Sequence, residues 1–255
     1  MTRILAVISG KGGVGKTTVT SNLSSALSKL GKEVIAVDAN LTTPNLGIHL
    51  GMHLAPVTLH DVLKGKMKLR DCIYPHPFGF KVIPASMKVE DLTGVDPIKL
   101  EEVTLSLLGK SDFVILDSAA GLGREAVSAI SAVDEILVVA NPELPSLTEA
   151  LKTVKLAEML EKNIVGVVLN KVRKKKYELK KEDAEEIVGY PVIAEIPEDK
   201  NVVKSVSVKM PVVDYAPYSP ASVEFMKLAC FLAGVDLRIE KKNIFRKILE
   251  WIVPI

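Results

Sequence analysis

Residues 10–18 of the chain read Gly-Lys-Gly-Gly-Val-Gly-Lys-Thr-Thr. Glycines let successive backbone N–H groups turn inward around a phosphate, and the start of a following helix adds partial positive charge. The spacing Gly-x-x-x-x-Gly-Lys-Thr predicts a phosphate-binding loop, with Lys16 on the β- and γ-phosphates and the Thr17 hydroxyl on Mg²⁺. The predicted nucleotide-binding residues of this loop are Gly10, Lys11, Gly12, Gly13, Val14, Gly15, Lys16, Thr17 and Thr18.

The segments on either side of the loop have the pattern that such a loop requires. Residues 4–8 form a continuous apolar run with the length of a buried parallel strand. Residues 19–30 place leucines and alanines on one helical face, and Gly31 follows as a stop signal. The sequence therefore predicts strand, loop and helix in that order.

Lys11 is a second lysine, directly after the first glycine, and one triphosphate in one subunit does not need it. Lys-Gly-Gly-x-Gly-Lys-Thr-Thr resembles the deviant phosphate-binding loop of the ParA/MinD family of dimerising ATPases. The resemblance implies that ATP and Mg²⁺ are cofactors, that a homodimer forms in the ATP state, and that Lys11 reaches the partner's nucleotide. Lys11 and Lys16 are then catalytic residues. The alternative is a solvated loop lysine.

Strands and helices alternate along the chain, which predicts an α/β fold with a doubly wound, mostly parallel sheet and helices on both faces. We expect one domain over residues 1–235 and a C-terminal amphipathic helix within 236–255. The predicted strands are 4–8, 33–38, 80–84, 112–117, 135–140, 163–170 and 192–195. The predicted helices are 19–30, 58–64, 97–108, 147–160, 182–188 and 222–233.

Asp38 and Asp117 each end a predicted strand, on the side of the sheet where the phosphate-binding loop lies. Carboxylates there hold Mg²⁺, usually through a water molecule. The predicted metal residues are therefore Thr17, Asp38 and Asp117. The alternative for either aspartate is a helix N-cap.

Longer segments extend the resemblance over most of residues 3–233. Residues 37–46 resemble switch I and residues 117–123 resemble switch II of MinD-type ATPases. The resemblance also implies that Asn170 and the segment Pro197, Glu198 and Asp199 border the adenine. A turn residue at the end of a strand is the alternative for Asn170.

One position departs from the family pattern. The second carboxylate of switch I, which orients the attacking water, is replaced by Asn40. An amide holds a water molecule but does not accept its proton as a carboxylate does. We expect Asn40 to occupy this catalytic position and hydrolysis to be slow.

Composition sets broader limits. The 255 residues are 48% hydrophobic and 5% aromatic, which suits Val/Ile/Leu-rich parallel strands, and the formal net charge is +2. Two cysteines far apart indicate a reducing compartment. With no signal-peptide pattern and no membrane-spanning run, we expect a cytoplasmic protein, peripheral on the cytoplasmic face of the membrane.

The function that we expect is that of a membrane-bound ATPase that positions cell-division or other polar machinery and has an unidentified protein partner. Three other functions are alternatives. An iron–sulfur scaffold ATPase needs paired cysteines that this chain lacks. A nucleotide-switched scaffold that hardly hydrolyses ATP is compatible with Asn40. A DNA-partitioning ATPase would use a basic cluster, although a solvated loop explains the cluster better and nucleic acid is the less favoured partner. The cluster comprises Lys171, Arg173, Lys174, Lys175, Lys176, Lys180 and Lys181.

The last residues have a separate character. From Arg238 onward the chain has five basic and two acidic residues. Basic residues on one helical face and aromatic and aliphatic residues on the other are typical of a helix that lies in an anionic membrane surface. A helix packed on the domain's own sheet is the alternative. The predicted membrane residues are Ile244, Phe245, Ile248, Leu249, Trp251 and Ile252.

Overall fold

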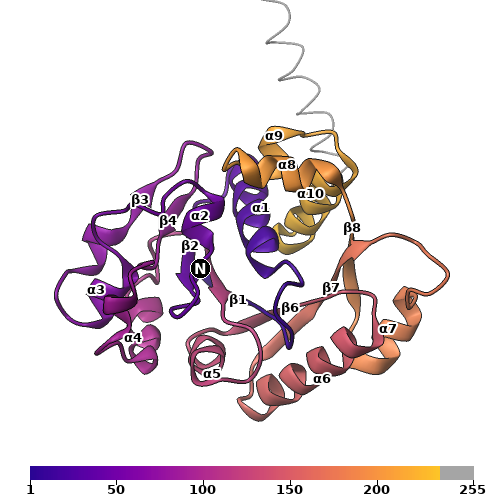
Figure 1. The fold of residues 1–255 in the computed structure, drawn as a ribbon, viewed down its shortest axis with the longest axis horizontal. Helices are drawn as coiled ribbons and strands as arrows, with labels where there is room; N and C mark the ends of the chain where they lie inside the picture. The colour runs from indigo at the N-terminus through magenta and orange to yellow at the C-terminus, as the bar shows by residue number, and fades with distance from the viewer. Residues whose placement is uncertain (236–255) are drawn as a thin grey trace, which may run out of the picture.

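The computed structural model describes residues 1–235, so the predicted membrane helix within 236–255 lies outside the described residues. Within residues 1–235, eight strands form one sheet in the order β3-β4-β2-β5-β1-β6-β7-β8 (Figure 1). Neighbouring strands are parallel except β3 and β4. The strands are β1 (Arg3–Ile8), β2 (Val34–Ala39), β3 (Tyr74–Pro75), β4 (Lys81–Ile83), β5 (Phe113–Ser118), β6 (Glu135–Ala140), β7 (Asn163–Val172) and β8 (Val192–Pro197).

Helices cover both faces of the sheet, as Figure 1 shows. The α-helices are α1 (Lys16–Lys29), α2 (Leu46–His49), α3 (Leu59–Leu63), α4 (Leu100–Leu105), α5 (Arg124–Ser131), α6 (Leu144–Met159), α7 (Lys181–Val188), α8 (Lys200–Ser207), α9 (Val212–Tyr215) and α10 (Pro220–Ala233). Short 3₁₀ segments are η1 (Leu69–Cys72), η2 (Val89–Leu92) and η3 (Pro97–Lys99). The predicted doubly wound α/β fold is confirmed.

Alternation along β1 divides the core into two layers. Ile4 and Ile8 pack in a cluster that includes residues of α3 to α7, whereas Leu5 and Val7 pack in a cluster that includes residues of α1, α9 and α10. Successive side chains of a strand point to opposite faces, so a sheet covered on both faces needs apolar residues at every position. This explains why residues 4–8 read as an unbroken apolar run.

The predicted elements differ from the structure mainly at their ends. Helix α1 begins at Lys16 rather than at residue 19, because the phosphate-binding loop ends at Gly15. The helix predicted over 97–108 was too long, since η3 precedes α4 and α4 ends at Leu105. The prediction missed β3, α5, α8 and α9, which span between two and eight residues each. Elements this short leave little periodic pattern to detect.

No helix within residues 1–235 is long and apolar enough to cross a bilayer.

Candidate functional site

The register of the sheet brings the two predicted metal-binding aspartates together. Asp38 of β2 and Asp117 of β5 are direct neighbours across the strand pair, and Val7 of β1 is opposite Asp117 on its other side. The loop after β1 therefore begins next to both carboxylates. This is the carboxyl edge of a parallel sheet, where ligands of doubly wound folds bind.

Lys16 lies at the first turn of α1 and is almost completely buried. Its ammonium donates to the Ser9 hydroxyl over 2.9 Å, and that hydroxyl donates to the Lys11 carbonyl over 2.8 Å. Burial lowers the pKa of Lys16, and the negative charge of Asp117 opposes this shift. Ser9 is a site residue that the sequence analysis missed, and its position directly before Gly10 was the available signal.

Asp117 is buried and accepts hydrogen bonds from two threonines of α1. The Thr17 hydroxyl donates to one carboxylate oxygen over 2.6 Å, and the Thr20 hydroxyl lies 3.4 Å from the other. Burial raises the pKa of Asp117 to about 6, although the Thr17 hydrogen bond and the Lys16 charge act in the opposite direction. Thr20 was not predicted, but it follows Thr17 by three residues and therefore shares its face of the helix.

Asp38 is fully buried, and one of its oxygens has no hydrogen-bond partner. Its other oxygen accepts from the Leu46 amide over 3.0 Å. Burial and the neighbouring Asp117 raise the pKa of Asp38 well above its usual range. An unpartnered buried carboxylate oxygen beside a second carboxylate and a hydroxyl is a donor set that suits a hard divalent cation.

The donor set is also small. No three His, Cys, Asp or Glu side chains within residues 1–235 lie together in a way that holds a metal ion. Thr17, Asp38 and Asp117 therefore fit Mg²⁺, which keeps several of its waters and needs few protein ligands.

Two glycines of the loop are required by close neighbours. A Cβ at Gly10 would overlap the backbone carbonyl of Glu149 in α6. Gly15 has a φ of +103°, and a Cβ there would overlap the side-chain nitrogen of Asn170. The first glycine thus lets α6 approach the loop, and the last allows a left-handed backbone against β7.

Two residues near the end of β7 donate hydrogen bonds to the phosphate-binding loop. Asn170 is buried, and its amide nitrogen donates to the Val14 carbonyl over 2.7 Å. The Lys171 ammonium donates to the Gly13 carbonyl over 2.7 Å. The structure therefore places Asn170 against the loop, and its predicted contact with adenine stays a prediction.

The segment after β8 has clear structural contacts. Glu198 forms a two-pronged ion pair with Arg173, at 2.7 and 2.8 Å. Asp199 caps α8 by accepting from the Asn201 amide over 2.8 Å, and it also accepts from the Ala221 amide over 3.3 Å. Burial raises the pKa of Asp199, but these hydrogen bonds outweigh it and leave the pKa lowered. The predicted adenine contacts of Pro197, Glu198 and Asp199 remain predictions.

Asn40 is bonded to its own loop. Its side-chain nitrogen donates to the Thr43 carbonyl over 2.6 Å, and its side-chain oxygen accepts from the Thr43 amide and hydroxyl at 3.3 and 3.1 Å. The next residue but one, Thr42, donates through its amide and its hydroxyl to Glu125 of α5. Glu125 was not predicted, because nothing local in the sequence links it to switch I.

Lys11 is exposed, and its ammonium has no hydrogen bond or ion pair with any side chain or carbonyl of residues 1–235. It lies on an open hollow that the loop shares with Leu144 and Thr148 of α6. Leu144 is itself exposed. The ammonium of the lysine that the sequence marked as surplus is therefore available to bind another group.

Three members of the predicted basic cluster have partners within the domain. Arg173 is paired with Glu198, Lys171 binds the Gly13 carbonyl, and Lys181 lies 3.8 Å from Glu185. The other four lysines, Lys174, Lys175, Lys176 and Lys180, are exposed in the segment between β7 and α7. This arrangement supports a solvated loop more than a surface that binds a polyanion.

Comparisons with known proteins agree with this geometry. The family model of the CobQ/CobB/MinD/ParA nucleotide binding domain matches residues 5–212. An uncharacterised ATP-binding protein of Methanocaldococcus jannaschii is 40% identical over 94% of this chain and 90% of its own length. The septum site-determining protein MinD of Thermotoga maritima is 32% identical over 94% of this chain and 91% of its own.

A solved structure gives the same result. The septum site-determining protein MinD of Pyrococcus horikoshii, complexed with Mg-ADP, is 40% identical to this chain. The two structures superimpose with a TM-score of 0.88, and the match covers 91% of this chain and 96% of the other.

The buried aspartates predict a specific pH dependence of stability. The pKa of Asp117 is about 6 in the folded protein, against an ordinary value of 3.8. Between pH 4 and 6, Asp117 is therefore protonated in the folded state and ionised in the unfolded state. The free energy of unfolding then falls as pH rises through this window. Full ionisation of Asp117 should cost on the order of 3 kcal/mol.

Urea unfolding in EDTA, from pH 4 to pH 7, should show this loss for the unchanged protein relative to Asp117→Asn. A difference between the two proteins that does not vary with pH would contradict the raised pKa of Asp117.

Proposed function

This chain belongs to the CobQ/CobB/MinD/ParA nucleotide-binding family, and we propose that it is an ATPase that dimerises around ATP and Mg²⁺ and attaches to membranes in that state. The observation that supports it most strongly is the buried site itself. The Thr17 hydroxyl donates to Asp117, the charge of Asp117 acts on the buried Lys16, and one oxygen of the neighbouring Asp38 has no partner. A bound nucleotide with its cation would supply the charges and hydrogen bonds that this site lacks.

The positions of the residues suggest a separate role for each. Backbone amides of residues 10–15 and the Lys16 ammonium would bind the phosphate oxygens. Thr17, Asp38 and Asp117 would hold Mg²⁺, which neutralises negative charge that develops during phosphoryl transfer. The Lys16 ammonium uses one of its three donors on Ser9, so two remain for phosphate oxygens. The Mg-ADP complex of the Pyrococcus relative supports this assignment.

Dimerisation is proposed from Lys11. It is exposed beside the loop, next to an exposed Leu144. A second subunit placed over this face would bring Lys11 near the partner's phosphates and would cover the apolar side chain. Association would then depend on the charge of the nucleotide.

Lys11→Ala should weaken the ATP-dependent dimer by roughly thirty-fold or more, because truncating one member of a buried interfacial charge pair costs about 2–5 kcal/mol. Binding of ADP to the monomer should be unchanged. Sedimentation velocity with ATP and with ADP measures both effects. Lys174→Ala, a loop lysine with similar exposure, is the control, and equal dimerisation of Lys11→Ala and this control would exclude the proposed role.

Slow hydrolysis is proposed from Asn40. Its amide is committed to Thr43 and offers no carboxylate to an attacking water. This observation also favours a second candidate function, a nucleotide-switched scaffold whose ATP state persists and recruits a protein partner. Retention of ATP over long incubation would favour the scaffold.

Asn40→Asp should increase the hydrolysis rate. A carboxylate has no donor for the Thr43 carbonyl, so residue 40 is held by one hydrogen bond fewer, and it can accept a proton from the attacking water, a step that contributes about 10²–10⁴-fold. Phosphoryl transfer depends less on base strength, so we expect the lower end of this range. The control is Asn45→Asp, because Asn45 also donates to the Thr43 carbonyl, over 2.8 Å. Equal phosphate release by all three proteins would show that residue 40 does not position the water.

Membrane attachment is proposed from the sequence of residues 236–255, with basic residues on one predicted helical face and Phe245 and Trp251 on the other. One such helix binds a surface weakly, and two in a dimer bind through avidity. The ATP state would therefore be the membrane-bound state, on the cytoplasmic face. By likeness to its septum-site relatives, the protein would help to position cell-division or other polar machinery.

Removal of residues 239–255 should abolish ATP-dependent sedimentation with anionic liposomes and leave the ATP dimer intact. Ile248→Asp on the predicted apolar face should reduce binding strongly, whereas Glu250→Gln on the polar face should not. If the shortened chain still sediments with the liposomes, the tail is not the anchor.

A further inference from the structure

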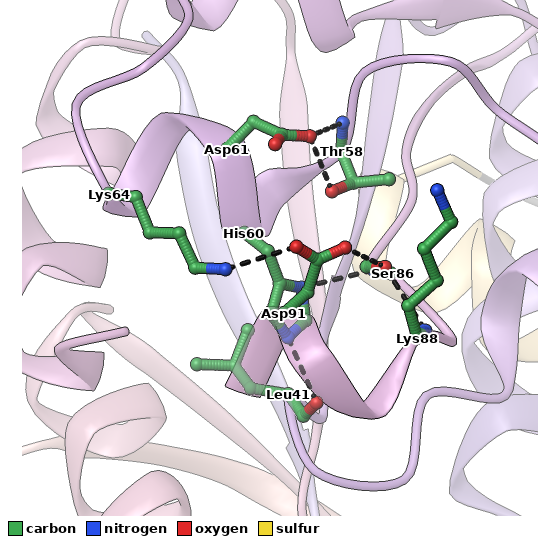
Figure 2. A network of polar contacts seen from close by, with 8 residues as sticks. All are labelled: Leu41, Thr58, His60, Asp61, Lys64, Ser86, Lys88 and Asp91. Atoms are coloured by element: carbon green, nitrogen blue, oxygen red, sulfur yellow. Dashed lines mark hydrogen bonds and ion pairs between the residues drawn. The ribbon is translucent and has the colours of Figure 1, made fainter. Parts of the chain in front are cut away.

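A buried histidine outside the nucleotide site holds the backbone of switch I. His60 of α3 has no solvent exposure, and both of its ring nitrogens contact main-chain groups. Nε2 lies 3.1 Å from the Leu41 carbonyl, and Nδ1 lies 3.0 Å from the Ser86 amide. Figure 2 shows the ring between these two segments of the chain.

These contacts determine the protonation of the ring. The Ser86 amide donates, so Nδ1 accepts and carries no proton. The neutral ring then has its proton on Nε2, which donates to the Leu41 carbonyl. Burial lowers the pKa of His60, in agreement with a neutral ring.

The ring is itself held in place by a polar network (Figure 2). The Ser86 hydroxyl donates to Asp91 over 2.6 Å, and Asp91 accepts from the Lys64 ammonium over 3.1 Å. At the start of α3, Asp61 accepts from both the amide and the hydroxyl of Thr58 at 2.9 Å. The helix that carries His60 and the segment that binds Nδ1 are therefore both anchored.

The Leu41–Thr42 peptide, which His60 contacts on one side, also has a hydrogen bond on its opposite side. The Leu41 carbonyl and the Thr42 amide belong to one planar peptide unit, in which C=O and N–H point in opposite directions. The carbonyl accepts from His60, while the amide donates to Glu125 of α5 over 3.2 Å. Glu125 lies two residues after the segment that resembles switch II, so this one peptide unit joins α3, switch I and α5.

We propose that His60 is a positioning residue that, together with Glu125, fixes the orientation of the Leu41–Thr42 peptide and through it the placement of Asn40. The importance of this placement rests on the proposed function, since Asn40 matters only if it faces the nucleotide. Rotation of this planar peptide would break both hydrogen bonds, so the two together hold its orientation.

A core histidine that merely fills space is the competing explanation, and His76 provides a comparison. His76 is also buried, and its Nε2 lies 3.1 Å from the Leu50 carbonyl at the end of α2. It therefore has the same kind of contact with the residue that ends α2, and its ring has no hydrogen bond with residues 40–43. His76→Gln is a matched control.

The test uses two variants that each keep one half of the histidine's contacts. In His60→Gln the amide nitrogen takes the place of Nε2 and still donates to Leu41. In His60→Asn the amide oxygen takes the place of Nδ1, accepts from Ser86 and leaves Leu41 without its donor. Each variant loses one hydrogen bond, so a purely structural role of His60 predicts similar exchange of the Thr42 amide in both.

Amide exchange by NMR on the full chain without nucleotide measures the outcome. In His60→Asn the Thr42 amide should exchange about five- to ten-fold faster, the effect of losing one hydrogen bond. In His60→Gln and His76→Gln the exchange rate of the Thr42 amide should stay within about two-fold of its rate in the unchanged protein. The Leu46 amide, which donates to Asp38, should not change in any variant.

Equal exchange at Thr42 in His60→Asn and His60→Gln would overturn the proposal. The unchanged protein gives an independent check if His60→Asn does not fold, because the imidazole ¹⁵N shifts must report a protonated Nε2 and a bare Nδ1. The opposite tautomer would also overturn it. Since no nucleotide is present, an absence of ATPase activity would refute the proposed function and leave this test unaffected.

Discussion

The pairing of β2 with β5 places two carboxylates side by side in the interior, and the rest of the site depends on this constraint. Asp38 and Asp117 are register neighbours, and burial raises the pKa of both. Buried like charges destabilise a fold unless cations or hydrogen bonds compensate them. Lys16 and Thr17 partly compensate Asp117, whereas one oxygen of Asp38 has no partner. A cation bound beside these two carboxylates would favour their ionised forms and would give the unpartnered oxygen of Asp38 a ligand.

The phosphate-binding loop is held by elements that are remote in the sequence. Asn170 and Lys171 donate to two loop carbonyls, and the backbone of Glu149 lies against Gly10. These contacts involve carbonyl oxygens, so they leave the loop's amides available for phosphates. A loop with fixed carbonyls and free amides is organised in advance, and preorganised donors bind developing charge without a reorganisation cost.

The switch segments are linked rather than independent. Asn40 is bonded within its own turn, Thr42 to Glu125, and Leu41 to His60. A movement that brings residue 40 toward a nucleotide must therefore break local hydrogen bonds, each worth about 1 kcal/mol.

The sequence by itself determined the loop, the α/β alternation and the positions of Lys16, Thr17, Asp38 and Asp117 at one edge of the sheet, because these follow from local spacing and from burial patterns along single strands. Only the tertiary structure decided which distant residues support them. Asn170 meets Val14 across 156 positions, and Glu125 meets Thr42 across 83. Strand order and helix packing create such contacts. No periodicity in the sequence encodes them. The contacts of Ser9 with the loop, and of Glu125 and His60 with switch I, are therefore seen only in the folded chain.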